Sequence, residues 1–301
     1  METYKITTKK DLEQFAAEGG YKVDGHLEVD TDLKIDGFLQ VEGYLSIKAG
    51  WLIKAGESIE AGGFIEAGWL IKAGGLIKAG GFIEAGESIE AGGPIEAGRY
   101  IEAGGFIEAG RYIEAGGYIK SEGYIKAGWY IKSEGYIKAG WSIEAGGYIK
   151  AGRYIKAGWL IKAGEYIEAG GYIEAGGYIK SEGSIEAGGF IEARGSIEAR
   201  GSIEAGRYIK AGGKFGISAG LQITCKGNLS FGLKCFAGIC TWKKITEEEK
   251  TITCSKLAEG GVVEYGILKE TGEPEENMVE VVIAGKTKQI SRESAEALNL
   301  I

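Results

Sequence analysis

The chain has 301 residues, of which 44% are hydrophobic, 54 are glycine and only two are proline. This composition favours a repeat array over ordinary globular domains. The formal net charge is −8, but residues 47–214 carry 20 Lys and Arg against 21 Glu, so the long middle of the chain is close to neutral. Nucleic-acid binding draws on a strongly basic surface, and we therefore expect no nucleic-acid partner.

The chain begins with a polar stretch, and no run of about 18 apolar residues occurs in it. We therefore expect a cytoplasmic protein that does not contact a membrane. Four cysteines follow the repeats, and their spacing lacks the close pairs of a zinc or redox site. We expect them to be small core residues, and we expect no metal or cofactor. They are Cys225, Cys235, Cys240 and Cys254.

Residues 1–22 are predicted to form an N-terminal helical cap. Residues 8–18 begin at a threonine, carry Leu12, Phe15 and Ala16 on one face, and end at Gly19 and Gly20. We expect this short helix to cover the open end of the repeat array that follows.

Residues 23–214 consist of six-residue units. From Ile47 onward the unit reads Ile-(Glu/Lys)-Ala-Gly-x-x, and four earlier units begin at Val23, Val29, Ile35 and Val41 and carry Leu at the fifth place. Aromatic residues recur every 18 residues, which is three units. They are Phe64, Phe82, Tyr100, Tyr118, Tyr136, Tyr154, Tyr172, Phe190 and Tyr208. This double period predicts an all-β fold, a three-sided parallel β-helix of 18-residue coils.

Strand alternation indicates which side chains of each unit face inward. It places Ile and Ala on one side and Glu or Lys on the other, and burying every charge would be prohibitively costly. The core is therefore predicted to be Ile and Ala. A glycine at the fourth or fifth place of each unit is predicted to make a corner with positive φ.

The pattern loosens after Lys214. Residues 215–258 are predicted to form irregular final coils, and residues 259–301 a small C-terminal α+β module. In that module VVEYGILKE and MVEVVIAGKTKQI are predicted strands separated by TGEPEEN, and a helix is expected to begin at Ser291. We expect the module to cap the rod, to dimerise it or to bind its partner.

The pairs Val23-Asp24, Ile35-Asp36 and Val41-Glu42 resemble the hexapeptide-repeat β-helix proteins, whose best-known members are acyltransferases. The segments VDGHLEV and KIDGFLQVEG also look like bactofilins, which are polymer-forming three-sided β-helices. The hexapeptide family places a small residue four after the aliphatic one, whereas here Ala lies two after Ile. The pattern therefore leaves the handedness of the helix open.

The resemblance to acyltransferases implies a catalytic histidine near a coil junction. The single histidine, His26, is expected at an outward position among acidic residues, and no long loop that could build a pocket is expected between the coils. These features favour a protein that is not an enzyme.

One face of the predicted rod is aromatic throughout, and two interpretations compete. The rings stack as a ladder that stabilises the rod, or they form a flat docking face for a protein or a second copy of the chain. Arginines beside the column are expected to make cation–π contacts or to touch the partner. The candidate partner-binding residues are Tyr100, Tyr118, Tyr136, Tyr154, Tyr172, Trp141, Trp159, Arg99 and Arg153.

These features predict a non-enzymatic interaction or scaffold protein that associates through its aromatic face and C-terminal module, including with itself. The alternative is an inhibitor, for example from a phage or mobile element, that occludes a host defence protein or nuclease. A hexapeptide-type acyltransferase is a more distant alternative.

Overall fold

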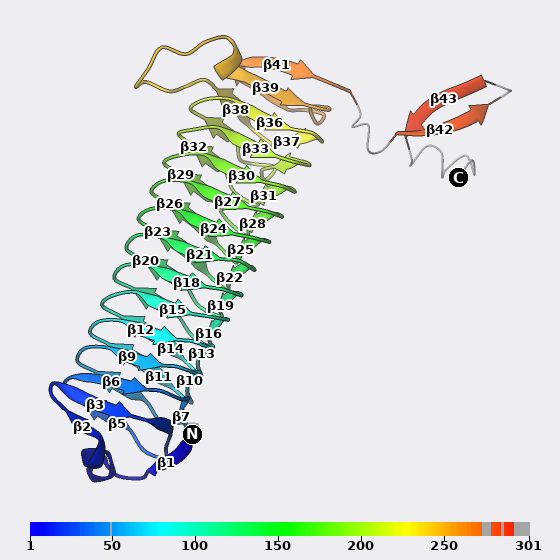
Figure 1. The fold of residues 1–301 in the computed structure, drawn as a ribbon. Coiled ribbons are helices and arrows are strands. Elements are labelled where there is room, and N and C mark those ends of the chain that lie inside the picture. Colours follow the sequence, from blue (N-terminus) through cyan, green and yellow to red (C-terminus); the bar gives the residue numbers. More distant parts are fainter. Residues whose placement is uncertain (49, 273–277, 284–285, 292–301) are drawn as a thin grey trace.

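The computed structural model describes residues 1–48, 50–272, 278–283 and 286–291. It shows a long β-solenoid in which short strands follow one another around three sides (Figure 1). Each side is a sheet, and the sheets contain 13, 15 and 13 strands. All strand pairs of these sheets are parallel except the first pair of the 15-stranded one. The predicted three-sided parallel β-helix is therefore confirmed.

Sheet A is the 13-stranded sheet beside the aromatic residues. Its strands are β1 (Glu2–Ile6), β4 (Gly25–Val29), β7 (Leu45–Ile47), β10 (Ile65–Ala67), β13 (Ile83–Ala85), β16 (Ile101–Ala103), β19 (Ile119–Ser121), β22 (Ile137–Ala139), β25 (Ile155–Ala157), β28 (Ile173–Ala175), β31 (Ile191–Ala193), β34 (Ile209–Lys210) and β37 (Leu229–Ser230).

Sheet B has 15 strands. They are β2 (Ala16–Ala17), β3 (Gly20–Val23), β6 (Phe38–Val41), β9 (Ile59–Ala61), β12 (Ile77–Ala79), β15 (Ile95–Ala97), β18 (Ile113–Ala115), β21 (Ile131–Ser133), β24 (Ile149–Ala151), β27 (Ile167–Ala169), β30 (Ile185–Ala187), β33 (Ile203–Ala205), β36 (Ile223–Cys225), β39 (Thr251–Cys254) and β41 (Ile267–Glu270).

Sheet C completes the triangle. Its strands are β5 (Leu33–Ile35), β8 (Ile53–Ala55), β11 (Leu70–Ala73), β14 (Ser88–Ala91), β17 (Ile107–Ala109), β20 (Ile125–Ala127), β23 (Ser142–Ala145), β26 (Leu160–Ala163), β29 (Ile179–Ser181), β32 (Ile197–Ala199), β35 (Ile217–Ala219), β38 (Lys234–Ala237) and β40 (Val262–Tyr265).

The core consists of the predicted Ile and Ala columns. In a regular strand such as β16 the first and third residues are buried and the middle Glu or Lys faces outward. Every isoleucine of the regular coils from Ile53 to Ile209 is completely buried. Stacking identical branched side chains at the coil spacing fills the narrow interior without polar atoms.

The first four units enter this core in a different frame from the later ones. Leu45 aligns with Ile65, and Ile47 aligns with Ala67. Leucine therefore occupies the later isoleucine position, and the leading Val or Ile occupies the alanine position. Two extra residues between Ile47 and Ile53 make this change of frame, so the prediction of one continuous frame from Val23 is wrong.

Corner glycines are required by close approach of the next coil and not by positive φ. A Cβ on Gly128 would lie 2.2 Å from the carbonyl oxygen of Gly110 on the preceding coil. The six described glycines with positive φ lie outside the regular coils, and Gly50, at φ 86°, is in the two-residue insertion. The predicted positive-φ corner is therefore wrong, although the need for glycine is real.

Replacing a glycine of this kind is expected to destabilise the rod. Gly128→Ala would press a methyl group into the Gly110 carbonyl, and we expect the free energy of unfolding to fall by about 2–3 kcal/mol. Gly213→Ala is the control, because a Cβ there meets no atom within 4 Å and its φ is not positive. Urea denaturation followed by circular dichroism measures both. Equal stability of the two variants would contradict the close-approach explanation.

The N-terminal segment closes one end of the rod, but not as a separate helical cap. Strand β1 is already the first strand of sheet A, and a 3-10 helix, η1 (Lys9–Phe15), follows it. Leu12 of this helix is completely buried, and the rings of Tyr4 and Phe15 meet edge to face at 4.8 Å. The segment therefore mixes strands with one short 3-10 helix, and a longer helix over residues 8–18 is not confirmed.

The C-terminal coils extend further than the sequence indicates. Residues 262–270 are not one strand of a separate module, because Gly266, at φ 123°, divides them into β40, which pairs with β38, and β41, which pairs with β39. The hairpin instead forms within the next segment, between β42 (Met278–Ile283) and β43 (Lys286–Ser291). The predicted helix falls largely in residues 292–301, which lie outside the described residues.

A loop of residues 238–250 interrupts the coils between β38 and β39 and contains a second 3-10 helix, η2 (Glu248–Lys250). The expectation that no long loop separates the coils is therefore wrong. Of the four cysteines, Cys225, Cys235 and Cys254 are buried as predicted, whereas Cys240 in this loop is half-buried. Burial raises the pKa of Cys225 and Cys235 to about 12. Over the described residues, no helix is long and apolar enough to cross a membrane.

Candidate interaction surfaces

The aromatic residues along sheet A form one continuous stack. From Tyr44 to Tyr208 adjacent ring centroids are 4.7 to 4.9 Å apart, with interplanar angles of 0 to 6°. This spacing equals the separation of strands in a sheet, so coil stacking alone brings the rings into register. Each ring covers its neighbours, and the stack contributes to the stability of the rod.

The stack extends one ring beyond the tyrosines at its N-terminal end. His26 lies over Tyr44 at 4.1 Å, and its Nδ1 accepts a hydrogen bond from the Tyr44 backbone N–H at 3.1 Å. His26 is the histidine that the resemblance to acyltransferases would make catalytic. Here its ring belongs to the aromatic stack, and one of its ring nitrogens accepts the hydrogen bond from Tyr44. Among the described residues no group of three or more His, Cys, Asp or Glu side chains forms a metal-binding cluster.

A simple rule determines the partner of each phenol in the rod. Where the residue 16 positions earlier, on the preceding coil, is Glu, the tyrosine hydroxyl donates a hydrogen bond to its carboxylate; in six of seven cases the distance is 2.8 to 3.1 Å. The pairs are Tyr44 with Glu28, Tyr100 with Glu84, Tyr112 with Glu96, Tyr118 with Glu102, Tyr124 with Glu108, Tyr130 with Glu114 and Tyr208 with Glu192.

These carboxylates raise the pKa of the phenols that bind them. Desolvation, followed by the charge of Glu84, raises the pKa of Tyr100 to about 12. The hydrogen bond to Glu96 is the largest cause of a similar rise at Tyr112. The neutral phenol is the better partner for an anion, so folding holds these tyrosines in the protonated form.

In the middle of the rod the residue 16 positions earlier is Lys instead. Tyr136, Tyr154 and Tyr172 follow Lys120, Lys138 and Lys156 in this way, and their hydroxyls donate no hydrogen bond within the described structure. Lys120 and Lys156 form ion pairs with Glu102 at 2.6 Å and Glu174 at 2.9 Å, whereas Lys138 lies between two lysines. The phenols of this stretch therefore have no hydrogen-bond acceptor among the described residues.

The nine predicted partner-binding residues lie along one side of the rod. The five tyrosines each precede a strand of sheet A, from β16 to β28. Arg99 and Arg153 stand at the corner before the column, and Trp141 and Trp159 at the corner after sheet A, where they are 70% and 59% exposed. We call this side, from Arg99 to Tyr172, the aromatic face.

The arginines of the aromatic face do not form the predicted cation–π contacts. In the described structure that contact is made instead by Arg111, whose guanidinium lies 4.8 Å from the ring of Trp129 on the next coil, at a different corner. Trp159 packs edge to face against Tyr178 of the next coil at 5.8 Å, so the rod itself partly holds this indole ring. Arg99 and Arg153 are exposed beside the column.

A second surface is the C-terminal end of the rod, which falls within residues 259–301, the predicted C-terminal module. Strands β40 and β41 terminate sheets C and B, so one edge of each is unpaired within the described residues. Several large apolar side chains are exposed there or nearby. They are Leu233, Ile239, Trp242, Val262, Tyr265, Ile267 and Leu268. The sequence signal for this surface is the apolar run Val262-Val263 and Ile267-Leu268 after the repeats.

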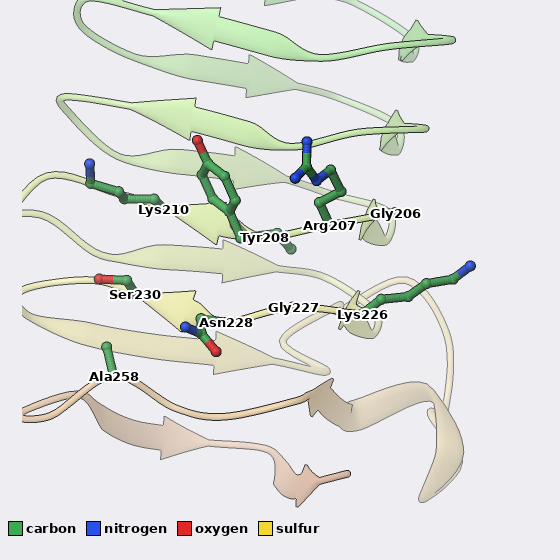
Figure 2. A pocket seen from close by; sticks show the side chains of 10 residues that line it. Gly206, Arg207, Tyr208, Lys210, Lys226, Gly227, Asn228, Ser230 and Ala258 are labelled. Carbon is green, nitrogen blue, oxygen red and sulfur yellow. The ribbon is translucent and has the colours of Figure 1, made fainter. Parts of the chain in front are cut away.

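A recess lies where the aromatic column ends (Figure 2). It has a volume of 460 Å³ and is lined by Arg207, Tyr208, Lys210, Lys226 and Asn228, among others. Two lining residues stand out in the sequence: Tyr208, the last ring of the aromatic column, and Arg207, which continues the 54-residue spacing of Arg99 and Arg153. The recess itself becomes visible only when the coils are aligned.

No protein-family model matches the chain, and comparison with curated proteins and with solved structures finds no match either. The parallel solenoid with its isoleucine repeat fits the hexapeptide-repeat β-helix class as an architecture.

Proposed function

We propose that the protein is a non-enzymatic scaffold that self-associates end to end through its C-terminal coils and presents its aromatic face to a protein partner. The observation that carries the proposal is the unpaired, apolar C-terminal edge. Val262 is 51% exposed and Ile267 39% exposed, on strands whose backbone groups lack a neighbour on one side among the residues that the structure describes. Such an edge is a template for pairing with another strand.

A second copy of the chain is the occupant that fits this edge. Two identical rods that meet end to end across a twofold axis bring the same strand of each into antiparallel pairing. The contact buries the exposed Val, Ile, Leu and Tyr side chains of both copies at once. At the opposite end η1 buries Leu12, and among the described residues there Met1 is the one exposed large apolar side chain, so we expect this association to stop at a dimer and not to continue into a fibre.

The aromatic face serves as the second contact surface. It is straight and rigid, and it combines free phenols at Tyr136, Tyr154 and Tyr172 with exposed Trp141 and Trp159. Tyrosine and tryptophan provide large contact areas at low entropic cost, which suits a protein partner. A dimer would display two such faces, and this arrangement is that of a scaffold.

The proposal is tested by the molar mass of the full chain, measured by light scattering on a sizing column from low to high micromolar concentration. We expect twice the mass of the 32.0 kDa chain, with dissociation on dilution. A constant mass of one chain over the whole range would refute self-association. A mass that grows without limit would refute the closed dimer.

A further inference from the structure

The C-terminal end of the aromatic column is an uncovered ring. Tyr208 stacks on Phe190 at 4.9 Å with parallel planes, but on the next coil Ile209 aligns with Leu229, so Asn228 takes the place of the next ring. The recess lies over this position, between Tyr208, Asn228 and Ala258 (Figure 2). One face of Tyr208 is therefore open at the place where another ring would continue the stack.

Tyr208 is a rigid platform. Its hydroxyl donates a hydrogen bond to Glu192 at 3.1 Å, and Lys210 binds the same carboxylate at 2.8 Å. Phe190 supports the opposite face of the ring. A flat group that enters the recess thus meets a preorganised surface, so little binding free energy is lost to ordering of protein side chains.

Two cations line the recess beside this platform. Figure 2 shows Arg207 and Lys226 on the same side of Tyr208, at the corner of consecutive coils. Both side chains are exposed, and neither forms an ion pair within the described structure. Lys210, on the other side, is already neutralised by Glu192. Both uncompensated charges therefore lie on one side of Tyr208, with the Arg207 guanidinium beside the ring and the Lys226 side chain extended outward from the next coil (Figure 2).

The floor of the recess carries polar side chains that belong to the final coils. Asn228 accepts a hydrogen bond from the Ser255 hydroxyl through Oδ1 at 3.1 Å, which leaves its Nδ2 amide group as a donor. Ser230 adds a hydroxyl on the side of Lys210. A purely hydrocarbon ring would leave these groups unpaired, whereas a heteroaromatic ring offers them acceptors.

We propose that this recess binds a mononucleotide-class ligand, with its planar base stacked on Tyr208 and its phosphate held by Arg207 and Lys226. The volume of 460 Å³ lies within the range of small-molecule sites. The base of such a ligand would stack on the aromatic side chain. Its doubly charged phosphate would pair with the two cations. The site is independent of the aromatic face and of end-to-end association.

Calorimetric titration of the full chain with AMP tests the proposal, with adenosine and ribose 5-phosphate as the separate halves. We expect one AMP per chain and binding of each half that is at least about tenfold weaker. Tyr208→Ser is expected to weaken both AMP and adenosine about tenfold, because it removes the platform. Arg207→Gly is expected to weaken AMP by a similar factor and to leave adenosine unchanged, because it removes only the phosphate contact.

Arg153→Gly is the matched control, since it removes the equivalent corner arginine three coils away from the recess, where the column is continuous. Glycine is the native residue at the same corner position at 171 and 189, so both arginine variants are compatible with the fold. Circular dichroism verifies that each variant is folded. The proposal is overturned if neither AMP nor GMP binds at millimolar concentration, or if Arg153→Gly weakens AMP as much as Arg207→Gly does.

Discussion

Between pH 10 and pH 12 the rod is expected to lose its stability steeply and to unfold in one narrow interval of pH. Tyr100, Tyr112 and Tyr124 have pKa values of about 12 in the folded chain, against an ordinary value of 10. Desolvation and the carboxylates of the preceding coil cause these shifts. A group whose pKa is raised by folding stabilises the fold below its ordinary pKa, and this stabilisation is lost as the pH rises through the folded value.

Several tyrosines share this behaviour, so their contributions add along the rod. Tyrosinate absorbance and circular dichroism, recorded together during alkaline titration, measure the effect. We expect the phenols to ionise above pH 10 and simultaneously with loss of the β signal. Reversible ionisation centred at pH 10, with an unchanged circular dichroism spectrum, would contradict the role of the Tyr–Glu hydrogen bonds.

Paired variants test the cause of the alkaline transition. Glu84→Gln removes the charge that faces Tyr100, and we expect it to lower the pKa of that phenol. Glu66→Gln is the control, because the ring that follows it on the next coil is Phe82, which has no phenol to titrate. If both variants lower the pKa of Tyr100 equally, the shift comes from the overall charge of the rod and not from the Tyr100–Glu84 hydrogen bond.

Charging the C-terminal edge is expected to convert the dimer into a monomer. The double variant Val262→Glu and Ile267→Glu places four carboxylates in the proposed contact, two from each copy, and like charges in a desolvated interface are strongly unfavourable. Both side chains are exposed in the single rod, so the fold is expected to persist. We expect the dissociation constant of the dimer to rise at least about 100-fold.

Trp141→Glu is the control for the charged edge. Trp141 is 70% exposed and belongs to the aromatic face, so its replacement is expected to leave the molar mass unchanged. If Trp141→Glu dissociates the protein and the edge variant does not, self-association occurs through the aromatic face.

The repeat made the coil predictable because one physical demand recurs in every unit. Ile and Ala must face inward and Glu or Lys outward, and the burial of Ile101 and Ala103 on either side of Glu102 follows from alternation alone. The ring column followed from the 18-residue period of its aromatic residues. Its length beyond Phe64 was not visible in that period, because Tyr44 is 20 residues earlier and joins the stack only through the two-residue insertion.

Features that depend on contacts between coils could not be read from single units. The sequence predicts positive φ at the corner glycines, whereas the carbonyl of the preceding coil is what excludes a side chain, as at Gly128. The sequence predicts a separate module from residue 259 on, because the repeat is broken by the loop of residues 238–250, whereas β40 and β41 continue the sheets of the rod. The uncovered ring of Tyr208 likewise depends on which residue aligns with it one coil later.

The length of the particle in solution, measured by small-angle X-ray scattering, tests the end-to-end assembly most directly. Stacking 13 coils gives a rod of about 60 Å. We predict that the wild-type protein has nearly twice the maximum dimension of the Val262→Glu and Ile267→Glu variant, with the same cross-section. A wild-type particle of the same length but larger cross-section would show side-by-side association through the aromatic face, and would contradict the proposed C-terminal contact.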